Sequence, residues 1–188
     1  MSTALKRSLV LGLILAFGLS ANLAAAKSLT AGTVYIEPKV GLYANSNDRI
    51  SSMFSYGGEL GYFVADGFSL GFEALGYVIT QKRTAWGGNG NYETVNAFSP
   101  IGMLRYHFVN DEKFGVFAGI GLGGFFSGVP VPRNGYSSNL TEVGEVGFDV
   151  FLTDNVSMQL AGRYQHIGDF SNKGADNWGG NLAVKYAF

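Results

Sequence analysis

The feature that most constrains the fold is a period-two alternation of apolar and polar residues, which recurs in eight segments. Successive side chains of a β-strand point to opposite faces, so each segment is predicted to be a strand with one apolar and one polar face. Turn-forming residues separate the segments. The eight predicted strands are Thr33–Asn45, Ser52–Val64, Phe68–Thr80, Thr94–Val109, Phe114–Ser127, Asn139–Leu152, Val156–His166 and Trp178–Phe188.

Residue number separates the two faces of every predicted strand. Even positions carry large apolar side chains such as Ile36, Leu60 and Phe148. Odd positions carry the charged and titratable ones, namely Glu37, Lys39, Glu59, Glu73, Arg105, His107, Glu145, Asp149, Arg163 and Lys185. A water-soluble barrel such as a lipocalin places its apolar side chains inside. We therefore predict an all-β protein, an eight-stranded antiparallel transmembrane β-barrel whose apolar face meets lipid.

The charged face would line the lumen of this barrel. Eight strands enclose a space just wide enough for side chains to fill. An isolated buried charge is costly, and the acidic and basic residues of this face are nearly balanced. The sequence thus predicts a plug of paired charges and no open pore.

Both ends of the chain carry export signals. Lys6 and Arg7 precede the apolar run Leu9–Leu19, and small residues at 24–26 suit cleavage before Lys27. Residues 1–26 are predicted to be a signal peptide and residues 27–188 the barrel. The alternating segment Trp178–Phe188 resembles the terminal signal of bacterial outer-membrane barrels. The expected location is the outer membrane of a Gram-negative cell, reached with periplasmic chaperones and the barrel-assembly machinery.

Charge and composition exclude several classes. The chain has 13 Lys and Arg residues, two of them in the predicted signal peptide, against 14 Asp and Glu, which leaves the predicted mature chain at −3. No basic excess points to nucleic acid as a partner. Cysteine is absent, so no disulfide framework is expected. No residue pattern calls for a metal or a cofactor, and the expected partner is outer-membrane lipid or lipopolysaccharide.

Two titratable residues break the rule that apolar residues point outward. His166 and Glu142 are even-numbered and lie near the external ends of their predicted strands. If the hairpin at 153–155 pairs Leu152 with Val156, Glu142 falls directly opposite His166. A carboxylate that orients a histidine is the base half of a nucleophilic triad. The same pair would also be tolerated as a polar contact at the membrane interface, where such residues cost little.

A family resemblance extends this interpretation. Residues 163–179, RYQHIGDFSNKGADNWG, are similar to the C-terminal region of lipid A 3-O-deacylases (PagL-type) and related acyloxyacyl hydrolases, as are residues 129–135 and 139–154. The resemblance implies an eight-stranded outer-membrane barrel with a Ser/His/Glu hydrolase site on its lipid-facing surface. It also implies roles for His166 as general base, Ser171 as nucleophile, and Asn172 and Asn177 as oxyanion or substrate contacts.

The segment departs from the family in two places. Four residues separate His166 from Ser171, where the family has one, and no acid follows Asp176. Glu142 is therefore predicted to supply the carboxylate. The predicted function is hydrolysis of an ester-linked acyl chain of lipid A. The alternative is a non-catalytic barrel, structural or adhesive, that acts through loops such as Trp86–Tyr92.

Overall fold

The computed structural model describes residues 29–45, 50–82, 92–133, 135–168 and 174–188. The predicted signal peptide lies outside these ranges. Within them, no helix is long and apolar enough to cross a membrane. The eight strands are β1 Val34–Asn45, β2 Ile50–Ala65, β3 Phe68–Lys82, β4 Tyr92–Asn110, β5 Phe114–Ser127, β6 Ser138–Phe151, β7 Val156–Ile167 and β8 Ala175–Ala187.

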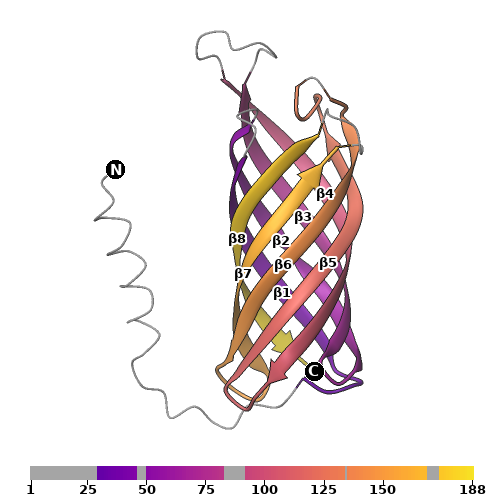
Figure 1. The fold of residues 1–188 in the computed structure, drawn as a ribbon, viewed down its shortest axis with the longest axis vertical. Coiled ribbons are helices and arrows are strands. Elements are labelled where there is room, and N and C mark those ends of the chain that lie inside the picture. Colours follow the sequence, from indigo (N-terminus) through magenta and orange to yellow (C-terminus); the bar gives the residue numbers. More distant parts are fainter. Residues whose placement is uncertain (1–28, 46–49, 83–91, 134, 169–173) are drawn as a thin grey trace, which may run out of the picture.

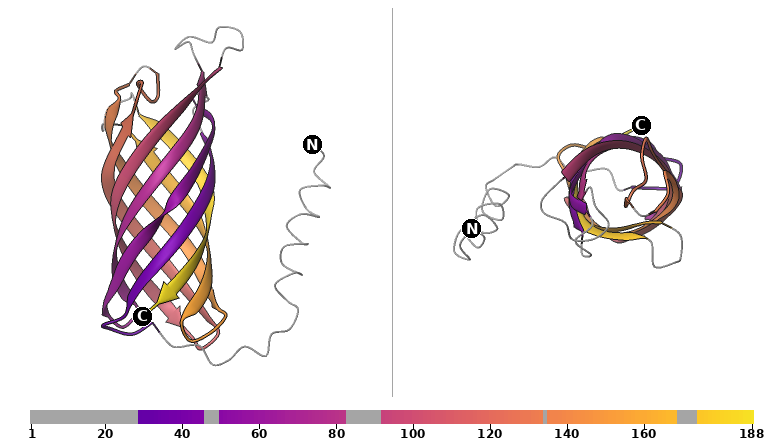
Figure 2. Two further views of the ribbon diagram at one scale, coloured as in Figure 1. Left: turned by 180° about the vertical axis from the view of Figure 1, so that it is seen from behind. Right: turned by 90° about the horizontal axis from the view of Figure 1, so that it is seen from above.

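The strands form one closed antiparallel barrel, which confirms the predicted fold class (Figure 1). Each strand pairs with its neighbour in sequence, and β1 pairs with β8 to complete the ring seen from above in Figure 2. The chain makes tight turns at one end, at residues 66–67 and 111–113, and its C-terminus lies at this same end. Short turns mark the periplasmic end of such barrels, so the opposite end is external.

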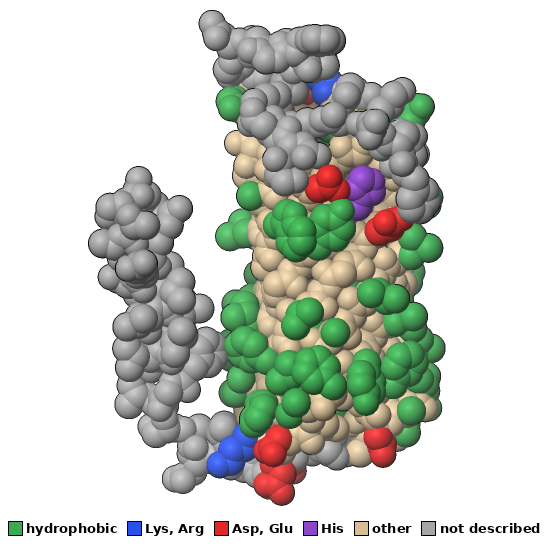
Figure 3. Space-filling view, viewed as in Figure 1, with side chains coloured by type: hydrophobic (Ala, Val, Ile, Leu, Met, Phe, Trp, Pro, Cys, Tyr) green, Lys and Arg blue, Asp and Glu red, His purple; other side chains and the backbone are tan. Residues whose placement is uncertain are grey.

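The predicted division of faces is confirmed. Leu60, Phe72 and Phe148 are 57 %, 56 % and 38 % exposed on the outer wall, whereas the charged odd positions are buried inside. Hydrophobic side chains accordingly gather over the outside of the barrel in Figure 3. An outer surface of this kind would be insoluble in water, and it matches the hydrocarbon of a bilayer.

Ile120 provides a test of this orientation, because it points outward near the middle of β5 and is 64 % exposed. Ile120→Arg should lower the free energy of unfolding in bilayers by about 2–4 kcal/mol, since a charge there faces the hydrocarbon. Phe126→Arg, closer to the external end of the same strand, should cost only about 0–1 kcal/mol. Urea titration in lipid vesicles measures both values. Equal costs at the two positions would contradict the assigned membrane depth.

The middle of the lumen is filled by paired charges, as the sequence predicted. Glu73 and Arg163 form a bidentate pair with contacts of 2.7 and 2.9 Å, and Lys39 Nζ lies 2.7 Å from Glu73 Oε1. Arg105 reaches both Glu59 and Glu145. Closer to the periplasmic end, Asp149 contacts His107 at 3.0 Å and Lys185 at 3.1 Å. These contacts compensate for taking the charges out of water.

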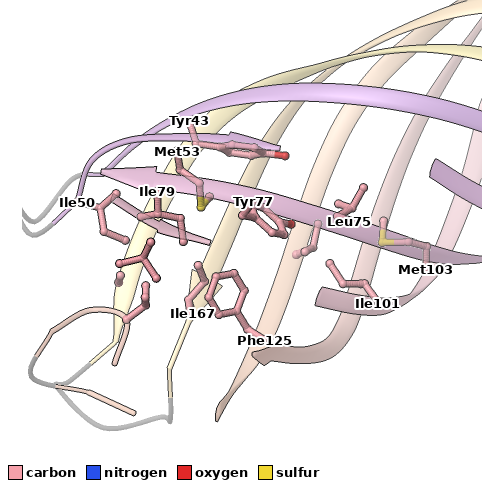
Figure 4. Packing of buried hydrophobic residues seen from close by; sticks show 14 residues of the cluster. Tyr43, Ile50, Met53, Leu75, Tyr77, Ile79, Ile101, Met103, Phe125 and Ile167 are labelled. Carbon is pink, nitrogen blue, oxygen red and sulfur yellow. The ribbon is translucent and has the colours of Figure 1, made fainter. Parts of the chain in front are cut away.

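Apolar side chains close the lumen above and below the charged layer. The external layer includes Leu75, Tyr77, Ile101 and Phe125, which point inward from the wall in Figure 4. Val131, from the connection between β5 and β6, is fully buried within this layer.

A second apolar cluster closes the periplasmic end. Leu29, which precedes β1, packs there with Tyr35, Phe63 and Phe151. Its backbone oxygen accepts a hydrogen bond from the amide of Gly67, in the turn between β2 and β3. The N-terminal segment is thereby held across the periplasmic mouth.

These three layers lead to a prediction about conduction. Planar-bilayer recordings of the purified protein should show no stable porin-sized openings, because paired charges and two apolar layers occupy the lumen. The conductance of a variant that lacks residues 128–137 provides a comparison with the wild-type protein. This deletion removes Val131 from the external layer and leaves the charged layer in place. Reproducible large openings of the wild-type protein would contradict the arrangement described here.

Candidate functional site

The outer wall near the external end holds a row of three polar side chains from three adjacent strands. Glu142 of β6 pairs directly with His166 of β7, as the hairpin register predicted, and His166 pairs with Asp176 of β8. All three are even-numbered and face outward. In Figure 3 a histidine lies between two acidic groups above a group of hydrophobic side chains.

The row lies at the level of the external membrane interface. His166 is ten residues beyond Val156, the first residue of β7. At about 3.3 Å per residue and a tilt of about 40°, this places it roughly 25 Å up the wall. Tyr164 and Trp178 form the next row toward the membrane centre, with ring centroids 4.8 Å apart. Aromatic residues of this kind occupy the interfaces of outer-membrane barrels.

Hydrogen bonds fix the histidine to the acid of β8. His166 Nδ1 lies 2.8 Å from Asp176 Oδ1, and the Tyr164 hydroxyl donates to the same oxygen at 2.7 Å. The side chains of His166 and Asp176 are 19 % and 34 % exposed. With Nδ1 donating to the carboxylate, Nε2 is the basic nitrogen of the ring.

Asp176 is the residue that the sequence interpretation missed. The last strand was predicted to begin at Trp178, which left Asp176 in a loop and made Glu142 the only outward-facing acid within the predicted strands. β8 in fact begins at Ala175, so Asp176 lies in the strand with its side chain outward. Extending the alternation by three residues would have found it, because Ala175 and Asn177 continue the inward face.

The predicted nucleophile falls in the connection between β7 and β8. Ser171 and Asn172 lie outside the described residues. The flanking glycines are described, and both adjoin the histidine ring: a Cβ atom built on Gly174 would lie 2.6 Å from His166 Nε2, and one on Gly168 would lie 3.5 Å away. The connection therefore starts and ends beside the basic nitrogen.

Asn177 lies on the other side of the wall. It is fully buried on the lumen face, and its amide donates to the backbone oxygens of Gln165 and Ala175, both at 3.2 Å. Its oxygen accepts from Asn45 at 3.1 Å. These bonds hold its side chain away from the outward row.

Two other predicted features can be located. The Trp86–Tyr92 loop lies outside the described residues except for Tyr92, the first residue of β4, which is exposed. Among the residues that the structure describes, no group of three or more His, Cys, Asp or Glu side chains could hold a metal ion.

Comparison with known proteins supports the fold and the location. A family model for the outer membrane protein beta-barrel domain matches residues 11–188. The OprG structure from Pseudomonas aeruginosa is 16 % identical, with a TM-score of 0.61, and the match covers 88 % of this chain and 99 % of that one. Neisserial surface protein A is also 16 % identical, with a TM-score of 0.60 and coverage of 83 % and 96 %.

The N-terminal barrel domain of Pseudomonas aeruginosa OprF is 19 % identical, with a TM-score of 0.56 and coverage of 84 % and 98 %. At these identities the likeness concerns the fold alone. No curated protein matches the chain.

The closed barrel, its apolar outer wall and its charged lumen define a small integral outer-membrane protein. The chain belongs to the outer membrane protein beta-barrel domain family, and its location is the bacterial outer membrane.

Proposed function

We propose that the protein hydrolyses an ester-linked acyl chain of lipid A at the external surface of the outer membrane. The observation that carries this proposal is the hydrogen bond from His166 to Asp176, on the lipid-facing wall at the level of the interface. A membrane-embedded ester can reach this wall without leaving the bilayer. An oriented histidine at that depth is the general base that a serine esterase requires.

Each residue has a defined role in the proposed reaction. His166 Nε2 takes the proton of the Ser171 hydroxyl as its oxygen attacks the ester carbonyl. The lipid A hydroxyl then leaves with that proton, and the acyl group remains esterified to Ser171. Water, activated by the same nitrogen, attacks this acyl-enzyme, releases the fatty acid and restores the serine. Asp176 holds the histidine in orientation and stabilises the imidazolium that forms.

The position of Ser171 along the chain is compatible with this role. Two residues separate it from Gly174, which adjoins the histidine ring, so the chain places it at most about 10 Å from that glycine. Asn172, the next residue, is the proposed donor to the oxyanion. Because Asp176 contacts the ring, we assign it as the orienting acid, and Glu142 becomes a flanking charge on the opposite side.

A fluorophosphonate probe tests the proposed nucleophile directly. Such a probe should label the wild-type protein at Ser171, because it reacts with serines that a neighbouring base activates. Ser171→Ala should abolish the labelling, and His166→Ala should reduce it strongly. Ser138→Ala is the matched control, since Ser138 is an exposed serine in β6 outside the row of polar residues. Labelling that persists in Ser171→Ala would exclude this serine as the nucleophile.

One observation favours the second candidate, a non-catalytic barrel with a structural or adhesive role. Asn177, to which the resemblance gives an oxyanion role, is bonded inside the lumen. In that case the row at His166 would be a polar contact at the interface and the external loops would carry the function. A folded protein with no reactive serine in the probe experiment would support this candidate.

A further inference from the structure

The outer wall below His166 has a hollow floored by glycines. In the row next toward the membrane centre, Gly144 of β6 pairs with Tyr164 of β7, which in turn pairs with Trp178 of β8. In the next row, Val146 of β6 pairs with Gly162 of β7, which in turn pairs with Gly180 of β8. Three even-numbered, outward positions on adjacent strands thus have no side chain. Figure 3 shows an area without hydrophobic or charged side chains between the hydrophobic group below the histidine and the hydrophobic side chains lower on the wall.

These glycines face open space. A Cβ atom on Gly144 would meet nothing within 4 Å, and one on Gly162 would meet only the backbone oxygen of Val146, at 3.9 Å. On Gly180 the nearest atom would be a backbone oxygen at 3.4 Å. Packing of the barrel therefore does not require glycine at these positions, which distinguishes them from Gly61 or Gly179, where a Cβ would collide with the wall or with lumen side chains.

The hollow continues along the wall as a furrow. Its external part lies between Ala118, Tyr164 and Trp178 and has a volume of about 640 Å³. A second hollow shares Val146 and Gly162 with the first and runs past Leu160 to Phe114. The side chains that form its sides are apolar. The furrow starts in the row below His166 and ends near the periplasmic end of β5.

The external part of the furrow lies at the depth of the outer leaflet. Its rows, Gly144 with Tyr164 and Val146 with Gly162, lie two and four residues from the row of His166 toward the membrane centre. At about 3.3 Å per residue and a tilt of about 40°, they are roughly 5 and 10 Å below the interface. Half of a hydrocarbon core of about 30 Å is about 15 Å, so this part of the furrow faces the acyl chains of the outer leaflet. The second hollow continues from there toward the periplasmic end of β5.

We infer that this furrow, named here the glycine furrow and formed over Gly144 and Gly162, holds the acyl chain of lipid A whose ester the His166 site cleaves. This inference rests on the proposed function. Lipid A is the occupant because the external part of the furrow lies directly below the polar row, within the leaflet that lipid A forms. An acyl chain that lies against the backbone makes van der Waals contacts that projecting side chains would prevent. The ester at the upper end of that chain would then lie beside the polar row.

Photolabelling tests occupancy without requiring catalysis. The probe is lipid A with a diazirine at the middle of an ester-linked chain, in phosphatidylcholine vesicles that contain the His166→Ala protein. Cross-links should concentrate on furrow residues such as Val146, Leu160 and Tyr164. Gly162→Leu should lower this labelling about tenfold, because the new side chain displaces about two methylene groups from contact. Uniform labelling around the wall, including Leu60 and Phe72, would overturn the inference.

Gly102→Leu is the matched control. Gly102 also faces outward, and its nearest atom to an added Cβ is a backbone oxygen at 3.8 Å, but it lies on β4, away from the furrow. The control should fold and label as the parent does, and unchanged furrow labelling in Gly162→Leu would refute the assignment. A phospholipid with the same diazirine should label the furrow less than lipid A does, and equal labelling would exclude lipid A as the specific occupant. Labelling of the furrow by lipid A, without deacylation by the wild-type protein, would support the binding site and contradict the proposed esterase activity.

Discussion

Glu73→Ala should lower the free energy of unfolding by about 3–5 kcal/mol, the cost of removing one partner from a buried ion pair. Glu73 binds Arg163 through both carboxylate oxygens and also contacts Lys39, and all three side chains are at most 2 % exposed. Its removal leaves Arg163 and Lys39 in the lumen with fewer hydrogen-bond acceptors. Urea unfolding of the protein in lipid vesicles, followed by tryptophan fluorescence, measures the change.

Arg133→Ala serves as the control for this prediction. Arg133 pairs with Glu93 at 2.7 Å, but its side chain is 44 % exposed, so the loss should be within about 1 kcal/mol. Equal effects of the two substitutions would mean that the charged layer of the lumen contributes no more than a surface ion pair.

The second large effect concerns the orienting acid. Asp176→Asn should lower the rate of lipid A deacylation by roughly 10³–10⁴-fold, because the amide no longer holds the histidine in the basic tautomer or stabilises its charge. Tyr164→Phe removes only one hydrogen bond to that carboxylate and should cost about threefold to tenfold. Rates come from the release of fatty acid by the purified protein in mixed micelles with lipid A.

Glu142→Gln separates the two candidate acids. It lies in the same row as Asp176, and the expected rate stays within about threefold of the wild type, as for a nearby charge without direct contact. If the deacylation rate falls more in Glu142→Gln than in Asp176→Asn, Glu142 of β6 is the orienting acid. All three variants should still assemble, because the row lies on the outer wall at the interface.

The fold was predictable because the alternation fixes it locally. In a strand, one residue of register moves every side chain to the other face, so the parity of Leu60, Glu73 and Phe148 determined inside and outside together. The pairing of Glu142 with His166 in the strand register followed in the same way from a single tight hairpin. These are properties of neighbouring residues, which the sequence displays directly.

Features that depend on irregular segments were not predictable. Val131 and Leu29 close the two mouths of the lumen, but both lie outside the strands, where no periodicity indicates the direction of a side chain. Asp176 was missed for a related reason, since the start of β8 is marked only by small and polar residues. The glycine furrow appears only when the registers of β6, β7 and β8 are combined.

Mass spectrometry of lipid A tests the central claim most directly. Cells that produce the wild-type protein should contain lipid A lacking one ester-linked acyl chain, whereas cells producing His166→Ala at the same level in the outer membrane should contain intact lipid A. Heat-modifiable migration in gels verifies that both proteins are folded. Intact lipid A in both strains, with both barrels folded, would contradict the assignment of His166 and Asp176 to an esterase.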